Sequence, residues 1–195
     1  MGRRPKFAED DFLDAALGIA VARGAPAVTI ADVAAAAGAP VGSVYHRFAS
    51  RDLLLARLWV RSVRRVQRAF LDAPPGGDDP GLAAERAVAL ALRWVAEHPG
   101  EARLLLLHRR EDLVRRWPRE LGEELAGLND AVADALRGHA RALYGRASKE
   151  AVERVTFALV DIPYAAVRRR LASGEPLPPT LERMAVAACR AALAD

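Results

Sequence analysis

The segment from Thr29 to Phe48, TIADVAAAAGAPVGSVYHRF, constrains the fold of this chain more than any other. Thr29 followed by Asp32 forms a capping box, in which a hydroxyl and a carboxylate satisfy free amide groups at a helix start. Gly38 supplies the positive φ that a tight turn needs, and Pro40 suits the start of the next helix because its missing N–H is harmless there. The segment therefore predicts two short helices joined by a tight turn.

Two short helices joined by a glycine-containing turn of three or four residues are typical of a helix-turn-helix motif. We expect the first helix over residues 30–37 and the second to end at about Phe48. In this motif the second helix enters the major groove of DNA. We expect Val44 and Phe48 to pack inward, which leaves for DNA Val41, Ser43, Tyr45, His46 and Arg47.

The rest of the chain also has the apolar spacing of helices, and no segment shows the alternation of a strand. The sequence therefore predicts an all-α fold of about nine helices. Breaks rich in proline and glycine at 72–81 and 172–180 interrupt the helical pattern. Outside the motif, the expected helices cover residues 9–23, 51–70, 82–97, 101–117, 118–144, 148–172 and 179–194.

The net charge of +4 is distributed unevenly along the 195 residues. Residues 1–68 carry 11 Lys+Arg and 6 Asp+Glu, a net of +5, whereas the remaining residues carry 18 and 19, a net of −1. A basic excess confined to one region is typical of a surface that binds a polyanion. The charge distribution thus favours a nucleic-acid partner for the N-terminal third.

Several classes of protein are not expected from this sequence. Cys189 is the only cysteine, which excludes an internal disulfide and a cysteine-rich metal site, and the histidines lack HExxH-like spacing. The chain has no nucleophile elbow, phosphate loop or recognisable pair of catalytic carboxylates, so we do not expect an enzyme. It also lacks a long uncharged stretch and a secretory signal. We therefore expect a cytoplasmic protein without a metal, a cofactor or a membrane segment.

Residues Thr29 to Leu58 resemble the DNA-binding signature of TetR-type transcriptional regulators. The shared positions are Thr29, Val33, Ala34, Ala37, Gly38, Gly42, Tyr45, Phe48 and the run from Ser50 to Leu54. The resemblance implies a DNA-binding domain over 1–50 and a helical ligand-binding and dimerisation domain over 51–195, with helix 51–70 as connector. It also implies a homodimer, formed through the last two helices, that represses from a palindromic operator in double-stranded DNA until a small-molecule effector binds.

The expected DNA-binding residues are Thr29, Val41, Gly42, Ser43, Tyr45, His46, Arg47 and Arg51. The resemblance implies phosphate contacts for Tyr45 and Arg51, and Thr29 can cap its helix and touch phosphate at once. Arg47 stands where the family often has histidine, and its guanidinium can bind a phosphate in bidentate fashion. His46 can contact a base or a phosphate, or be an exposed side chain without a role.

The other expected contacts depend on small side chains. Ser43 can bond a base or a phosphate, and Val41 offers only an apolar contact to a thymine methyl. Gly42 costs about 1 kcal/mol in helix propensity relative to alanine, which indicates close packing or close approach to DNA. Pro40 replaces the serine or threonine usual in the family. At the N-terminus Arg3, Arg4 and Lys6 can form a basic arm or be solvated charges without a role.

The candidate ligand-binding residues are Trp59, Trp94, Leu107, Trp117, Phe157, Asp161 and Tyr164. Aromatic and leucine side chains can form an apolar pocket, although they can equally be ordinary core. Asp161 and Tyr164 can line a pocket or form a polar pair at a dimer interface, and Pro163 should bend their helix. The small residues expected to let the last two helices approach a partner are Ala158, Ala165, Ala166, Ala185, Ala188 and Ala192.

Two alternatives to a ligand-released repressor stay open. A chain with the same fold can use its body to bind another protein, and a regulator of this type can activate transcription. A partly apolar, enclosed cavity in the body would favour a small ligand, whereas a filled core would favour a protein partner.

Overall fold

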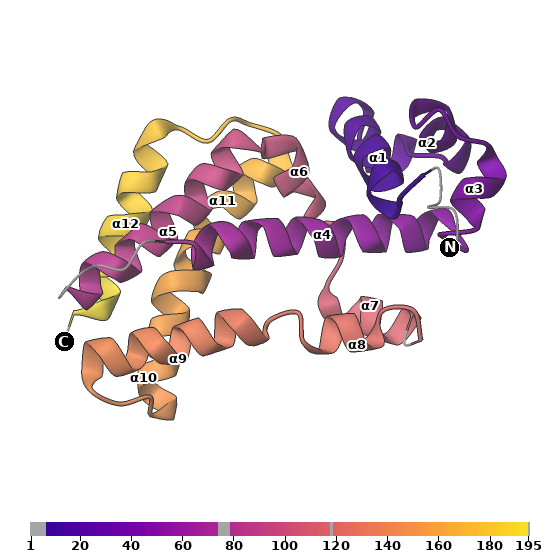
Figure 1. Ribbon diagram of the computed structural model, residues 1–195. Helices are drawn as coiled ribbons and strands as arrows, with labels where there is room; N and C mark the ends of the chain where they lie inside the picture. Colours follow the sequence, from indigo (N-terminus) through magenta and orange to yellow (C-terminus); the bar gives the residue numbers. More distant parts are fainter. Residues whose placement is uncertain (1–6, 74–78, 118, 195) are drawn as a thin grey trace.

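The computed structural model describes residues 7–73, 79–117 and 119–194, and over these residues the protein is all-α, as predicted. Figure 1 shows α4 as a long rod that joins α1–α3 at one end to α5, α11 and α12 at the other. The helices are α1 (Glu9–Arg23), α2 (Ile30–Ala36), α3 (Val41–Tyr45), α4 (Arg51–Leu71), α5 (Pro80–Glu97), α6 (Pro99–Leu104), α7 (Arg110–Arg116), α8 (Gly122–Ala126), α9 (Asp130–Tyr144), α10 (Lys149–Thr156), α11 (Ile162–Ser173) and α12 (Pro179–Leu193).

Hydroxyl caps fix the starts of α2, α4 and α10. The side-chain oxygens of Thr29, Ser50 and Ser148 accept hydrogen bonds from backbone amides three residues ahead, at 3.0, 3.1 and 3.2 Å. These bonds satisfy amide groups that the first turn of a helix leaves without a partner. Gly38 has a φ of 62°, so the turn between α2 and α3 has the predicted left-handed residue.

Three hydrophobic clusters form along α4. The first, here called the N-terminal cluster, joins α1–α3 to Leu54 and Leu58 of α4. The body cluster joins the C-terminal end of α4 to α5 and α9–α12. A third, the hairpin cluster, packs α7, α8 and their neighbours onto Trp59 and Val60. The first half of α4 therefore packs against the N-terminal cluster on one side and the hairpin cluster on another, and its C-terminal end packs in the body cluster.

Two expected helices are broken in the structure. The one predicted over 101–117 divides into α6 and α7, and the one over 118–144 divides into α8 and α9; residue 118 lies outside the described residues. Leu105, Leu106 and Leu107 bond carbonyls three residues back, at 3.0–3.1 Å, which tightens and ends α6. Local periodicity missed these breaks because the turns let leucine and tryptophan side chains pack onto the remote helix α4.

The helix predicted from Ser148 to Ala172 is continuous but contains a π-helical turn, η2 (Phe157–Asp161), between α10 and α11. The turn comes just before Pro163, which cannot donate a backbone hydrogen bond. A π turn holds one residue more than an α-helical turn, so the side chains that follow it point in directions rotated from those of an uninterrupted α-helix. Where a bend was predicted at Pro163, the structure has a π turn that ends two residues before the proline.

Candidate nucleic-acid interface and ligand cavity

Helix α3 divides into an inward and an outward side, as its sequence predicts. Val44 and Phe48 are 0% and 1% exposed within the N-terminal cluster, and the Phe48 ring meets Phe12 edge-on at 6.5 Å. On the other side Val41 and Tyr45 are 44% and 54% exposed. Also exposed are Gly42, His46 and Arg47, whereas Ser43 is half-buried. The surface of α3 thus combines small, aromatic and cationic groups that base edges and phosphates can accept.

The start of α3 depends on Pro40, which has a φ of −62° and precedes the first helical residue. Its carbonyl accepts a hydrogen bond from the Ser43 amide at 2.9 Å. Because proline has no side-chain hydroxyl, the cap comes from backbone geometry alone. Thr29, which begins α2, is exposed and accepts only the Asp32 amide through its oxygen, so its hydroxyl hydrogen can still be donated to a phosphate.

The structure gives Arg51 a different task from the one expected. Its guanidinium donates to the carbonyls of Val28, Ala25 and Pro26, at 2.5, 2.9 and 3.1 Å, and pairs with Asp52 at 3.2 Å. These bonds fasten the turn before α2 to the start of α4. Since its nitrogens already have partners in the protein, we assign Arg51 to positioning the motif and no longer to a phosphate contact. The expected arm of Arg3, Arg4 and Lys6 lies outside the described residues.

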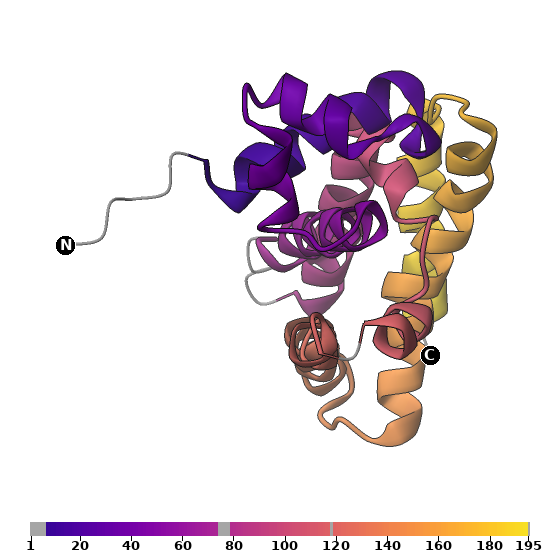
Figure 2. The same cartoon turned by 90° about the vertical axis from the view of Figure 1, so that its right-hand side faces the viewer.

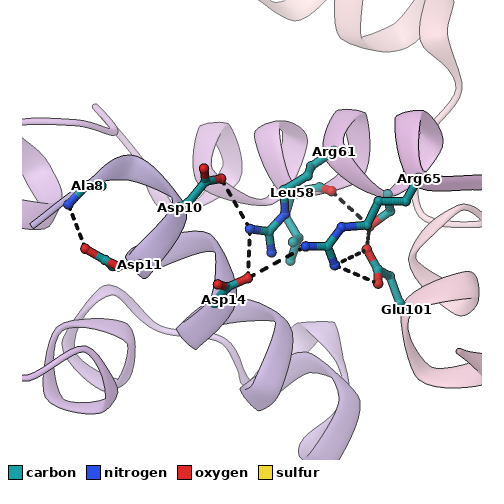
Figure 3. A network of polar contacts seen from close by, with 9 residues as sticks. Ala8, Asp10, Asp11, Asp14, Leu58, Arg61, Arg65 and Glu101 are labelled. Carbon is teal, nitrogen blue, oxygen red and sulfur yellow. Dashed lines mark hydrogen bonds and ion pairs between the residues drawn. The ribbon is translucent and has the colours of Figure 1, made fainter. Parts of the chain in front are cut away.

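A polar network joins α1 to α4 and α6 (Figure 3). Arg61 of α4 bonds Asp14 and Asp10 of α1 at 2.9 and 3.4 Å. One turn further along α4, Arg65 bonds both oxygens of Glu101 in α6, at 3.0 and 3.2 Å. The network therefore ties the helix-turn-helix region to both the connector and the body.

Glu101 is the buried centre of this network, only 4% exposed. Its Oε1 accepts a second hydrogen bond, from the fully buried hydroxyl of Ser62, at 3.0 Å. A buried carboxylate needs such partners because an unpaired charge inside a protein is strongly destabilising. Glu101 is not among the residues predicted from sequence, although a serine on the buried side of an amphipathic helix, Ser62, indicates a buried polar partner.

Helix α6 packs closely against α1 beside this network. Leu104 of α6 belongs to the N-terminal cluster, whereas Ala102 belongs to the body cluster. A Cβ atom built on Gly100 would lie 2.6 Å from a methyl group of Val21, so only glycine allows this approach. The short helix α6 thus contacts both the N-terminal cluster and the body cluster.

The body contains a cavity of about 390 Å³, which lies in the range typical of small-molecule sites. Its walls come from six helical elements, α4, α5, α9, α10, η2 and α11, and from the turn after α6. Leu105 and Leu106, which follow α6 directly, form part of the wall. The cavity therefore begins where the contact between α6 and the N-terminal cluster ends.

Of the residues expected to bind a ligand, only Tyr164 lines this cavity. Trp59 and Trp117 are buried in the hairpin cluster, where the Trp59 Nε1 donates to the Leu105 carbonyl at 3.3 Å. Trp94 stacks on His98, with ring centroids 5.1 Å apart. Three more are exposed and do not line it: Leu107, Phe157 and Asp161. The other six residues do not line this cavity, because aromatic content does not reveal which core a side chain joins.

An exposed apolar face extends over η2, α11 and α12, which form one edge of the molecule in Figure 2. Phe157 and Tyr164 are 54% and 52% exposed, and Met184 of α12 is 66% exposed. Among the small residues expected here, Ala165 and Ala188 are exposed, but Ala158 and Ala185 are buried within the chain. Apolar side chains gathered in this way are typical of an interaction surface.

These features define a helix-turn-helix DNA-binding protein with a helical body. The family model described as bacterial regulatory proteins of the tetR family matches residues 12–58. Over these residues the chain has the DNA-binding domain of the TetR family, so the predicted resemblance is confirmed there. No match is found among curated protein sequences. In the described part of the chain, no helix combines the length and the apolar character needed to cross a membrane.

Solved structures share the fold over nearly the whole chain. A transcriptional regulator from Rhodococcus sp. Rha1 is 20% identical, with 96% of each chain covered and a TM-score of 0.69. A TetR family transcription regulator from Marinobacter aquaeolei VT8 is 19% identical, with 94% of each chain covered and a TM-score of 0.65. The ketosteroid transcriptional regulator KstR2 of Mycobacterium tuberculosis is 16% identical, with 97% of this chain and 95% of that chain covered and a TM-score of 0.59. At such identities the similarity establishes the fold alone.

Proposed function

We propose that this regulator is a homodimeric repressor that leaves a palindromic operator when a small molecule enters the cavity. The observation that carries the proposal is the position of α6. Leu104 packs in the N-terminal cluster, Glu101 is bonded to α4, and the next residues, Leu105 and Leu106, line the cavity. A ligand that displaces these leucines acts directly on the element that holds α1 and α4.

The mechanism requires the ligand to bind two arrangements of α4 and α6 with different affinity, since otherwise it shifts no equilibrium. In the DNA-bound arrangement, the contacts of Arg61 and Arg65 hold α1 at a fixed angle to the body. Occupation of the cavity would move the turn after α6 and weaken this constraint. In a dimer, a small rotation of α4 changes the distance between the two recognition helices, which must match half-sites about one DNA turn apart.

For the DNA contact we retain Thr29, Val41, Gly42, Ser43, Tyr45, His46 and Arg47. The first helical residues of α3 approach base edges, and Tyr45 and Arg47 bind the flanking phosphates.

We also propose a domain boundary at residues 50–51, with α4 as connector. The division of α4 between the N-terminal cluster and the body cluster supports this boundary.

For the dimer we propose the exposed face of η2, α11 and α12. Its apolar side chains would be covered by the same face of a second copy, as a two-fold axis requires. Ala188→Arg on the exposed side of α12 should shift the protein from dimer to monomer in sedimentation velocity. Ala142→Arg on the exposed side of α9 is the matched control and should leave the mass unchanged.

The DNA contact is tested by selecting genomic fragments on the purified protein and then measuring affinity for the enriched sequence. Tyr45→Ala and Arg47→Ala should each weaken binding about tenfold, and Arg47→Ala should reduce the salt dependence by about one counterion. Arg141→Ala, which removes an exposed arginine from α9, should bind as the parent does. Equal affinity of all three variants would show that α3 does not face DNA.

We favour a small ligand over a protein partner as the signal for the body, because the cavity, although partly open to solvent, has apolar walls around a volume typical of small-molecule sites. A reporter gene behind the enriched operator separates repression from activation: deletion of the regulator raises expression in the first case and lowers it in the second.

A further inference from the structure

The chemistry of the cavity wall restricts the class of molecule that it can hold. No charged side chain among the described residues lines it. The wall includes buried apolar side chains on five helical elements: Phe70, Leu92, Leu136, Leu159 and Val167. A charged group brought into such a wall would lose its water without gaining a partner, which is strongly unfavourable.

The four polar side chains of the wall are at its rim or are already bonded. The Thr156 hydroxyl donates to the Val152 carbonyl at 2.8 Å. Gln67 Nε2 donates to Asn129 Oδ1 at 2.9 Å, and Asn129 is exposed to solvent. Tyr164 is 52% exposed. The amide pair of Gln67 and Asn129 keeps further donor and acceptor positions, so one edge of the cavity can bond an uncharged polar group.

We propose that the ligand of this cavity is an uncharged, predominantly aliphatic or alicyclic molecule that enters with its apolar end first. Its single polar group stays at the rim formed by Gln67 and Asn129. Phosphate-bearing and nucleotide-bearing molecules are excluded from the interior, because nothing in the described wall can neutralise them. The inference rests on the proposed effector role of the cavity and adds the chemical class of the effector.

A matched set of probes with ten-carbon chains tests the class: decan-1-ol below its solubility limit, and decanoate and decyltrimethylammonium below their micellar concentrations. Binding to the full-length protein is measured by titration calorimetry and by the shift in Tm. Decan-1-ol should bind at least about tenfold more tightly than either ion, since burial of an unpartnered charge is costly. Octan-1-ol should bind more weakly by roughly fourfold for each methylene removed.

Two substitutions locate the site. Ala133→Phe fills the cavity from α9 and should abolish binding of decan-1-ol, whereas Ala142→Phe on the exposed side of α9 should leave it unchanged. If Ala133→Phe does not fold, Ala91→Leu narrows the cavity from α5 and should lower the affinity instead. Gln67→Leu removes the rim amide. It should reduce the affinity for decan-1-ol roughly fivefold, which corresponds to the loss of one hydrogen bond.

The outcomes separate this inference from the proposed function. Tighter binding of either ion than of the alcohol overturns the ligand class while leaving an effector-released repressor intact. Binding of decan-1-ol at this cavity without release of operator DNA supports the ligand class and removes the effector role. Failure of every probe to bind, or equal binding to Ala133→Phe and the parent, overturns the inference.

Discussion

The helix-turn-helix region, residues 7–50, and the body, residues 79–117 and 119–194, use their interiors in opposite ways. The first has a filled core, in which Phe12, Val28, Val33 and Val44 are each 0% exposed, and its candidate function lies on the surface of α3. The body instead has apolar walls around an open volume of about 390 Å³. A surface that reads DNA needs a rigid support, whereas a body that responds to a ligand needs room and a wall that can move.

The two regions meet at α4 and α6, where their packing differs again. Leu54 and Leu58 of α4 are fully buried in the N-terminal cluster, so the start of α4 is fixed to the motif. Further along, Val66 and Phe70 face the cavity. A rigid attachment at one end and a space at the other let a ligand act on α4 without loosening the DNA-binding motif.

The largest expected effect tests the filled core. Phe48→Ala should lower the free energy of unfolding by about 3–5 kcal/mol, because a fully buried ring leaves a cavity that close packing cannot refill. Leu136→Ala at the cavity wall should cost only about 2 kcal/mol, since its side chain already has an empty side. Guanidinium unfolding of both variants measures the difference.

Tyr45→Ala on the exposed side of α3 is the control for this pair and should change stability by less than about 0.5 kcal/mol. Equal costs for Phe48→Ala and Leu136→Ala would mean that the two interiors are packed alike, and the contrast between the regions would fail.

The helix-turn-helix region could be predicted from sequence because its signals are local. The cap at Thr29, the turn at Gly38 and the inward positions Val44 and Phe48 all lie within one short segment, and each is confirmed. The cavity could not be predicted, because its wall combines residues from six elements whose arrangement depends on the whole fold. Tryptophan and phenylalanine content suggested a pocket but not its location.

Glu101→Gln tests the junction between the regions. We expect a loss of about 1–3 kcal/mol, because the variant removes the charge that pairs with Arg65 and disturbs the buried hydrogen bond from Ser62. Part of the guanidinium of Arg65 reaches water, which keeps the loss below that of a fully buried pair. Thermal and guanidinium unfolding give the loss, and operator release by a cavity ligand should become less sensitive to ligand concentration.

The matched control for the junction is Glu175→Gln, which disrupts the exposed pair with Arg170 and should cost at most about 0.5 kcal/mol. If Glu101→Gln resembles this control in both stability and operator release, the network does not connect the two regions.

Removal of one capping hydroxyl in each region gives a comparison with a smaller expected loss of stability. Thr29→Ala and Ser148→Ala each remove one hydroxyl that accepts a backbone amide, so each should cost about 1 kcal/mol. Only Thr29→Ala should also weaken operator binding, since Thr29 is the exposed cap of α2 in the helix-turn-helix region whereas Ser148 caps α10 in the body. Unfolding curves together with DNA titrations check both; equal operator affinity of the two variants would remove Thr29 from the DNA surface.

The smallest expected effect is a pH dependence confined to the body. Burial beside Phe70, with ring centroids 6.4 Å apart, lowers the pKa of His139 below its usual 6.5. The unfolded chain therefore binds a proton more readily than the folded one, so the stability from neutral His139 is present above pH 6.5 and is lost as the pH falls through the lowered value. The pKa of His108 is also lowered, chiefly by burial and then by Arg116, so protonation of His108 likewise destabilises the fold as the pH falls.

Hydrogen exchange, corrected for its intrinsic pH dependence, measures this effect. Helix α9 should lose protection before α1–α3 between pH 7.5 and 5.5, and His139→Gln should reduce that loss. Simultaneous loss in both regions would mean that acid unfolds the molecule as one unit, and the body would then have no separate response.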